Sequence, residues 1–258
     1  MLNKAKILKG YKLHGLDGEI GEVNEFYFDD QFWTVRYLVA NTVRWLPGRP
    51  VLISPYALGA VDKENRSITV KLTKKQIEES PSLESDKPVS RQFEEAYHEH
   101  YGWPAYWSGV YAWGPNPFIL PGRDKPKKNL FGGKRPDHHL RSTDKVSGYV
   151  IQASDGEIGH VSDFIIDEET WAIRYLVIDT RNWLPGKYVL VSTKWIERVS
   201  WVESKVYVNL SREMIKSSPE YTPESLLTRD YEIGLHRHYD RHGYWVEEVG
   251  AGKSAHIG

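Results

Sequence analysis

One internal repeat, held at a fixed spacing over most of the chain, constrains the fold more than any other sequence feature. The segment Asp17-Gly18-Glu19-Ile20-Gly21 returns 138 positions later as Asp155-Gly156-Glu157-Ile158-Gly159. The same spacing relates the aromatic segments 33–39 and 171–177, and the two Trp-Leu-Pro-Gly loops at 45–48 and 183–186. It persists without a gap to Trp107 and Trp245. A repeat of this length predicts a tandem duplication of one structural unit.

The repeat also predicts the domain boundaries. We expect a first domain at residues 1–107, a connector at 108–147 and a second domain at 148–258. The connector is rich in proline and glycine, which block regular structure, and carries a basic cluster between Arg123 and Arg135. We interpret it as a surface linker whose charges are solvated, with binding to an anionic partner as the alternative.

Each copy begins with short segments that alternate between apolar and polar residues, which is typical of β-strands. Asp17-Gly18 and Asp155-Gly156 have the composition of tight hairpin turns. Five or six short strands in about 65 residues favour a small barrel or a rolled sheet.

Helices are predicted to close each copy. Thr73, followed by Gln76, has the pattern of a capping box. Ser90 and Thr228 are good N-cap residues for a longer helix, which we expect to run to Gly102 in the first copy and Gly243 in the second. These C-terminal segments carry more aromatic residues than a small barrel needs for itself. We therefore expect them to pack onto the other barrel or onto a neighbouring chain.

Composition excludes several classes of protein. The 258 residues are 40% hydrophobic and 27% charged, which is enough for a packed core. The formal charge is −1, so no overall positive field favours nucleic acid. There is no cysteine, and no uninterrupted apolar run approaches the roughly 20 residues of a membrane span. We expect a globular cytoplasmic protein.

The Asp-Gly-Glu-Ile-Gly motif, followed by Trp-x-Val-Arg-Tyr-Leu-Val and then Val-Leu-Ile-Ser, resembles the PRC-barrel domain at about 11–81 and 149–219. This family is named after the photosynthetic reaction centre H subunit and is similar to the second domain of a ribosome-maturation factor. The resemblance implies a six-stranded antiparallel barrel that acts as an adaptor, with no catalytic residues common to the family. The expected fold is mostly β with α: two small antiparallel barrels, each followed by short helices, related by a pseudo-two-fold axis.

The Trp-Leu-Pro-Gly loops are the leading candidates for partner binding. Each ends in a cation, so the candidate residues are Trp45 and Arg49 in the first copy and Trp183 and Lys187 in the second. Exposed aromatic residues beside cations are typical of protein interfaces. The alternative is that each tryptophan covers one end of its barrel.

Arg36 and Arg174 lie in predicted strands among apolar residues, where an unpaired guanidinium would be costly. Glu19 and Glu157 repeat with them, so we expect a structural ion pair in each copy. An anion-binding arginine is the alternative.

No sequence motif announces a reaction, a cofactor or a metal site. His238 and His242 are four residues apart and could share a helix face, but Pro104 occupies the position equivalent to His242. Asp17 and Glu19 could suggest an acid and base pair, yet turn chemistry explains the aspartate better. We expect no catalytic residue, no metal and no cofactor.

The functional hypothesis is a non-catalytic protein-interaction or assembly adaptor, with peripheral association with a membrane complex left open. Two alternatives belong to other classes: an RNA- or ribosome-associated factor, and a binder of a small molecule or metal in the cleft between the barrels. The expected assembly is a monomer with internal pseudo-symmetry or a homodimer.

Overall fold

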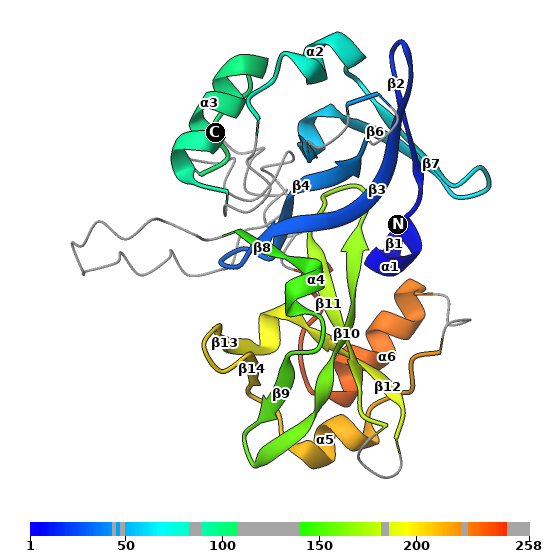
Figure 1. The fold of residues 1–258 in the computed structure, drawn as a ribbon. Coiled ribbons are helices and arrows are strands. Elements are labelled where there is room, and N and C mark those ends of the chain that lie inside the picture. The colour runs from blue at the N-terminus through cyan, green and yellow to red at the C-terminus, as the bar shows by residue number, and fades with distance from the viewer. Residues whose placement is uncertain are drawn as a thin grey trace, which may run out of the picture. The chain divides into compact units, whose positions relative to one another are not determined.

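The protein forms two compact units. The computed structural model describes residues 1–42, 45–46, 50–82, 89–107, 140–181, 186–222 and 227–246. The first-repeat unit comprises Ala5–Ser142 and Glu168–Ala172, and the second-repeat unit comprises Met1–Lys4, Thr143–Asp167 and Ile173–Gly258. Figure 1 labels most of the elements of both units. Arg49 and Trp183, and the predicted connector up to residue 139, lie outside the described residues.

The first-repeat unit holds one sheet of short strands, with helices before, between and after them. Its elements are α1 (Ala5–Leu8), β2 (Lys12–Gly15), β3 (Gly18–Asp29), β4 (Thr34–Asn41), β5 (Val51–Ile53), the 3-10 turn η1 (Pro55–Ala57), β6 (Leu58–Asp62), β7 (Ser67–Val70), α2 (Lys74–Glu78), α3 (Arg91–Tyr101) and β8 (Leu140–Ser142).

The second-repeat unit reproduces this series of elements. They are β1 (Leu2–Lys4), α4 (Thr143–Val146), β9 (Val150–Ala153), β10 (Gly156–Asp167), β11 (Ile173–Asp179), β12 (Tyr188–Ser192), the 3-10 turn η3 (Thr193–Trp195), β13 (Ile196–Ser200), β14 (Lys205–Val208), α5 (Arg212–Ser217) and α6 (Arg229–His238). The predicted connector therefore contains β8 and α4 in its last eight residues.

The two sheets have the same strand order, which confirms the structural repeat. The order is β5-β4-β3-β2-β7-β6 in one and β12-β11-β10-β9-β14-β13 in the other. Even the irregularities coincide: the β3–β4 ladder shifts register between Val23 and Glu25, and the β10–β11 ladder shifts between Val161 and Asp163.

The prediction of two closed antiparallel barrels is wrong in two respects. The pairs β2–β7 and β9–β14 are parallel, so both sheets are mixed. Among the described strands neither sheet closes, because the end strands β5 and β6 of one sheet, and β12 and β13 of the other, do not pair. Pro55 opens the intervening turn η1, and a proline there ends the extended strand.

Each sheet also includes a strand from the chain segment that precedes the other copy. In the second-repeat unit β1 pairs with β10, with Leu2 opposite Asp167. In the first-repeat unit β8 pairs with β3, with Leu140 opposite Asp29. These pairs correspond at the 138-residue spacing, so the exchange of strands is reciprocal.

The two glycines of the Asp-Gly-Glu-Ile-Gly motif have separate roles. The predicted hairpin is present, but its two turn residues are Leu16 and Asp17, and Gly18 begins β3. Gly21 faces β4 so closely that a Cβ there would lie 2.1 Å from the carbonyl oxygen of Asn41. Gly159 has the same relation to Asp179, at 2.3 Å. Only glycine fits at these positions without displacing the neighbouring strand.

The helix starts follow the sequence signals. Thr73 and Gln76 form the predicted capping box of α2, and Ser90 and Thr228 cap α3 and α6. Helix α3 ends at Gly102, as expected, with φ +66°.

The predicted end of α6 is wrong. The helix stops at His238, and Asp240 adopts φ +50° at the position equivalent to Gly102. Aspartate tolerates this left-handed conformation better than most residues, so the chain turns without a glycine.

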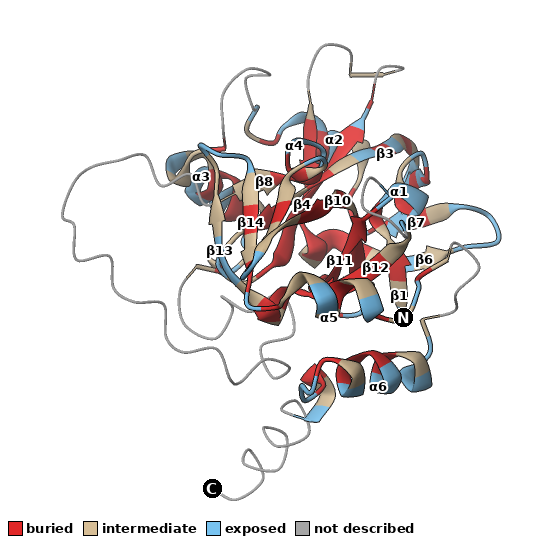
Figure 2. Ribbon diagram, turned by 90° about the horizontal axis from the view of Figure 1, so that it is seen from below, coloured by how far each residue is buried: buried red, intermediate tan, exposed pale blue. Residues whose placement is uncertain are grey.

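The C-terminal helices cover the sheet of their own unit, which corrects the expectation that they pack elsewhere. Tyr97 of α3 packs edge-on against Tyr37 of β4 at 5.3 Å between ring centroids and donates a hydrogen bond to the Leu52 carbonyl. Strands β4 and β11 are buried along almost their whole length, and α6 has one buried face (Figure 2). The aromatic residues of these helices therefore complete their own cores.

Candidate functional site

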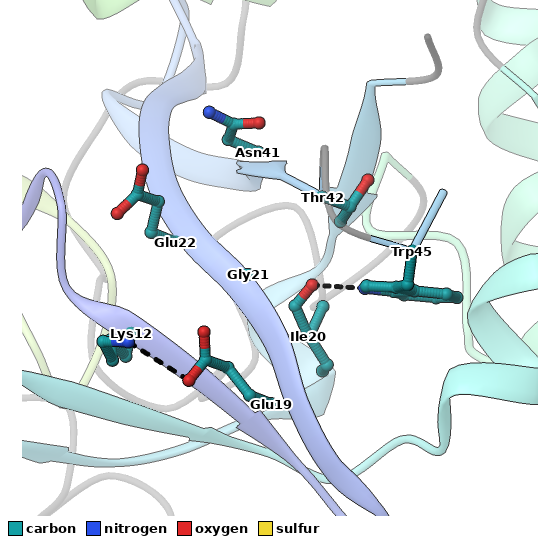
Figure 3. Close-up of a pocket in the computed structure, with 8 residues that line it drawn as sticks. All are labelled: Lys12, Glu19, Ile20, Gly21, Glu22, Asn41, Thr42 and Trp45. Atoms are coloured by element: carbon teal, nitrogen blue, oxygen red, sulfur yellow. Dashed lines mark hydrogen bonds and ion pairs between the residues drawn. The ribbon is translucent and has the colours of Figure 1, made fainter. Parts of the chain in front are cut away.

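Trp45 is held in a single pose by the start of β3. Its indole Nε1 donates a hydrogen bond to the backbone carbonyl of Ile20, and the ring is half-buried (Figure 3). The ammonium group of Lys74 lies over the same ring, 5.8 Å from its centroid. The side chain is thus neither a core lid nor a free surface residue.

A small pocket of about 120 Å³ lies beside Trp45 (Figure 3). Its polar walls include Asn41, Glu22 and the ion pair between Lys12 and Glu19, whose Nζ and Oε2 are 3.1 Å apart. The pocket combines one aromatic wall with charges of both signs. This combination suits a single side chain of a partner better than a whole substrate.

The other predicted anchor that the structure describes is engaged within its own unit. The Lys187 ammonium donates to the backbone carbonyl of Ser218, and the side chain is half-buried. Since its charge is directed inward, Lys187 does not reproduce the arrangement around Trp45. The predicted partner-binding role of these residues stays a prediction.

The predicted ion pairs have a different carboxylate. Arg36 is buried and pairs with Asp29 at 3.3 Å, and Arg174 pairs with Asp167 at 2.8 Å. Glu19 pairs with Lys12 instead. The ladder between β3 and β4 places Arg36 beside Tyr27 and Phe28, about 26 Å along the strand from Glu19.

The second copy repeats the correction. Glu157 lies at the start of β10 and pairs with Lys205 at 2.8 Å, whereas Asp167 ends the same strand. Each arginine has a carboxylate partner, but the predicted pairs Arg36–Glu19 and Arg174–Glu157 are wrong. The aspartate at the far end of the hairpin lies seven residues before its arginine in each copy.

Each arginine belongs to a buried polar cluster that we did not anticipate. In the first-repeat unit Glu94 is fully buried, accepts hydrogen bonds from Tyr37 and Tyr106, and pairs with Arg91 at 3.1 Å. The guanidinium of Arg36 lies 4.1 Å from the centre of the Tyr106 ring. Burial and the nearby Glu94 raise the pKa of the Tyr37 phenol. This cluster joins α3 to β4.

The second-repeat unit holds the matching cluster. Tyr175 donates to Glu232 at 2.8 Å, Arg229 pairs with Glu232 at 3.0 Å, and Arg174 lies 4.0 Å from the centre of the Tyr244 ring. The signal in the sequence was the repetition of every polar member at the 138-residue spacing. A carboxylate that recurs in step with two tyrosines and two arginines marks a shared buried network.

A histidine completes each cluster and is held neutral. Nδ1 of His98 donates to the carbonyl of Pro104, and Nδ1 of His236 donates to the carbonyl of His242, both at 3.0 Å. Burial lowers the pKa of His236 to about 4, and it also lowers the pKa of His98. With one ring nitrogen committed to a carbonyl, these histidines stabilise the chain that follows each helix.

The candidate acid–base pair and the possibility of a metal site can be compared with the described residues. No group of three His, Asp or Glu side chains in that part of the chain could hold a metal ion. Asp17 accepts a hydrogen bond from the Lys74 backbone N–H, while Glu19 pairs with Lys12, so the two carboxylates have separate partners. Within the same residues no helix is long and apolar enough to cross a membrane.

The segment that matches a known protein family covers the main strands of the second sheet. Residues 144–215 match the model of the PRC-barrel domain. The chain contains a PRC-barrel domain. The match runs from α4 to α5 and spans strands β9 to β14, so the family assignment and the sheet coincide. No curated protein matches the chain. The first-repeat unit has a sheet of the same strand order as this PRC-barrel domain.

Proposed function

We propose that the chain is a tandem PRC-barrel protein that works as a non-catalytic protein-interaction adaptor. The first repeat, at about 11–81, would be a second domain of the same kind. The equal strand order, the coincident register shifts and the reciprocal pairing of β1 and β8 support this part of the proposal. A pseudo-two-fold relation between the copies, the choice between monomer and homodimer, and association with a membrane complex stay predictions.

The observation that carries the interaction role is the fixed, half-exposed indole of Trp45. Its N–H is already satisfied by Ile20, so a partner can cover the ring without leaving a buried polar group unpaired. Lys74 connects this ring with the hairpin turn, because its backbone N–H bonds Asp17. In that turn Leu16 is 69% exposed. An aromatic ring, a cation and an exposed leucine form the type of patch that protein interfaces use.

The buried clusters support a structural role for the most unusual polar residues. Glu94 and Glu232 are buried between a helix and a sheet strand, and their hydrogen bonds and ion pairs connect those two elements. A catalytic carboxylate needs contact with a substrate, which this position does not offer. The polar networks are therefore part of the scaffold in our proposal.

A photo-crosslinking experiment in the host tests the adaptor role. A crosslinking amino acid replaces Leu16 in the hairpin turn, and the control replaces Val202, which is 98% exposed between β13 and β14. We expect a defined protein to be captured at position 16, little of it at 202, and a loss of capture when Trp45→Ala is added. Removing one interface tryptophan should cost about 2 kcal/mol of binding or more. Capture that is unchanged by Trp45→Ala, or equal at both positions, would contradict the proposal.

A further inference from the structure

A pocket in the first-repeat unit lies at a position where the two copies differ. It has a volume of about 450 Å³ and lies between η1, α2 and the end of α3. Tyr56, Tyr101 and Trp103 form its aromatic wall, with Ala57 and Lys71 beside them. This volume is within the range of small-molecule sites.

The backbone around the pocket is the same in both copies. The N–H of Lys71 bonds the carbonyl of Ala57, and the N–H of Asn209 bonds the carbonyl of Trp195. On the opposite side His100 lies 3.4 Å from the carbonyl oxygen of Gln76, as His238 lies 2.9 Å from that of Met214. The two copies share these backbone contacts, so the pocket in the first copy depends on side chains that differ between the copies.

In the second-repeat unit a tryptophan occupies this position. Trp195 stands where the first copy has Ala57, is only 4% exposed, and packs 4.6 Å from Tyr239 and 5.1 Å from His236. Arg241, which stands at the position of Trp103 after the helix, is exposed. Tyr239, at the end of α6, is thus covered by Trp195 of the 3-10 turn η3.

In the first-repeat unit the covering ring comes from the helix end instead. Trp103 stacks on Tyr101 at 4.4 Å with an angle of 15° between the rings, and Tyr56 stacks on Trp103 at 5.8 Å. Trp103 remains half-exposed, and the small Ala57 leaves the space beside it open. The three rings are half-buried and stack on one another, so they offer a ligand ring edge-to-face contacts, a favoured arrangement of aromatic pairs.

The pocket is lined by one cation, Lys71, and one carboxylate, Glu79. Glu79 is paired with Lys75 at 3.8 Å, whereas among the described residues no carboxylate pairs with the ammonium of Lys71. The second copy has Asn209 at the position of Lys71 and therefore lacks this cation. The cation and the open aromatic wall occur together in one copy and are replaced together in the other.

We propose that this pocket binds a small aromatic carboxylate, with the ring against Trp103 and Tyr101 and the carboxylate on Lys71. In the second copy Trp195 occupies the position of Ala57 and is buried. This inference is independent of the adaptor role, because the pocket and the Trp45 patch share no lining residue.

Titration of the full chain with two matched probes tests the inference. Isothermal titration calorimetry compares indole-3-acetate with its neutral analogue indole-3-acetamide. We expect one equivalent of indole-3-acetate to bind per chain, about tenfold more tightly than the amide, which corresponds to one charge-assisted hydrogen bond. Absence of saturable binding of indole-3-acetate would overturn the site, and equal affinity for both probes would overturn the carboxylate recognition.

Variants copied from the second repeat separate the two parts of the pocket. Lys71→Asn should reduce binding of indole-3-acetate to the level of the amide. The double variant Ala57→Trp/Trp103→Arg rebuilds the second-copy arrangement and should abolish binding of both probes while the melting temperature is kept. As a control, Asn209→Lys should add no second equivalent, because Trp195 is still present.

Two outcomes with these variants would overturn the proposal. One is binding that persists in the Ala57→Trp/Trp103→Arg variant with unchanged stoichiometry. The other is an unchanged preference for the carboxylate in Lys71→Asn. The second readout remains decisive if the double variant fails to fold, because Lys71 is exposed and its replacement leaves the core intact.

Discussion

Asp240 is the residue where the second copy departs most simply from the first. The backbone of both copies turns at this point with positive φ, but the first copy has Gly102 there and the second has an exposed aspartate. The left-handed backbone conformation is less favourable in free energy for a residue with a Cβ atom than for glycine. We expect Asp240→Gly to stabilise the second-repeat unit by about 0.5–1 kcal/mol in urea denaturation.

The reverse change serves as the control for this prediction. Gly102→Asp should destabilise the first-repeat unit by a similar amount, since a Cβ at Gly102 meets no atom within 4 Å. If Asp240→Gly were neutral or destabilising, the side chain of Asp240 would have to contribute more than its backbone conformation costs.

The neutral histidines give the protein a pH dependence with a defined sign. The pKa of His236 in the folded protein, about 4, lies below the value near 6.5 of an unfolded chain. Burial is the main cause, and the cations Lys194 and Arg229 lower it further. The stabilisation is complete above about pH 6.5 and is lost as pH falls towards 4.

Thermal melts between pH 7 and pH 4.5 measure this loss. At pH 5 the protein should be roughly 2 kcal/mol less stable than at pH 7 through His236 alone. His236→Gln should be less stable at pH 7 but show a smaller decline, with His98 still contributing in the same direction. A decline of equal slope in the variant would exclude His236 as its source.

At the scale of single elements, the hairpin turn and the following short helix form one unit. The carboxylate of Asp17 accepts the first backbone N–H of α2, from Lys74 at 2.9 Å, and Asp155 accepts the N–H of Arg212 at 2.7 Å. The turn residue of the Asp-Gly motif thus also serves the helix N-terminus, where negative charge is favourable.

We expect Asp17→Ala to cost about 1 kcal/mol of unfolding free energy, and Asp155→Ala to cost the same. Asp17→Asn keeps an acceptor oxygen and should recover most of the loss, which distinguishes the hydrogen bond from the charge. Chemical denaturation of the three variants is the measurement. Equal stability of Asp17→Ala and the natural protein would mean that the turn alone explains the aspartate.

The elements also show which inferences a sequence can support. Hairpin turns, N-caps and the repeat depend on neighbours in the chain, so Asp17-Gly18, Thr73 and Ser90 were predictable. The partner of Arg36 depends on the register of β4 against β3, which alternation does not determine. The contact between Glu94 and Tyr37 joins residues 57 positions apart. The end of α6 was missed because the turn there uses an aspartate.

At the scale of the whole molecule, the exchange of β1 and β8 links each sheet to a distant part of the chain. Removal of residues 2–4 therefore should affect the second-repeat unit and not the unit that follows them in sequence. It deletes the pairing of β1 with Ile165, Ile166 and Asp167 and the contact of Lys4 with the Tyr221 ring. The expected loss is roughly 2 kcal/mol, the net value of a few strand hydrogen bonds.

Hydrogen exchange with mass spectrometry locates that effect. The end of β10 should exchange faster in the deletion variant, while β3, which pairs with β8, keeps its protection. Faster exchange confined to the first-repeat unit would contradict the strand pairing. Replacing Lys4 alone by Ala, which leaves the backbone strand in place, is the matched control.

The pairing of β1 also fixes an order of events during synthesis on the ribosome. Residues 2–4 emerge before their partners at 165–167, which are made about 160 positions later. At 5–20 residues per second, the first strand waits roughly 8–30 s for its partner. Throughout that interval its backbone hydrogen-bonding groups are satisfied by water or by another chain. The second-repeat sheet is thus completed by a strand that is synthesised well before the other strands of that sheet.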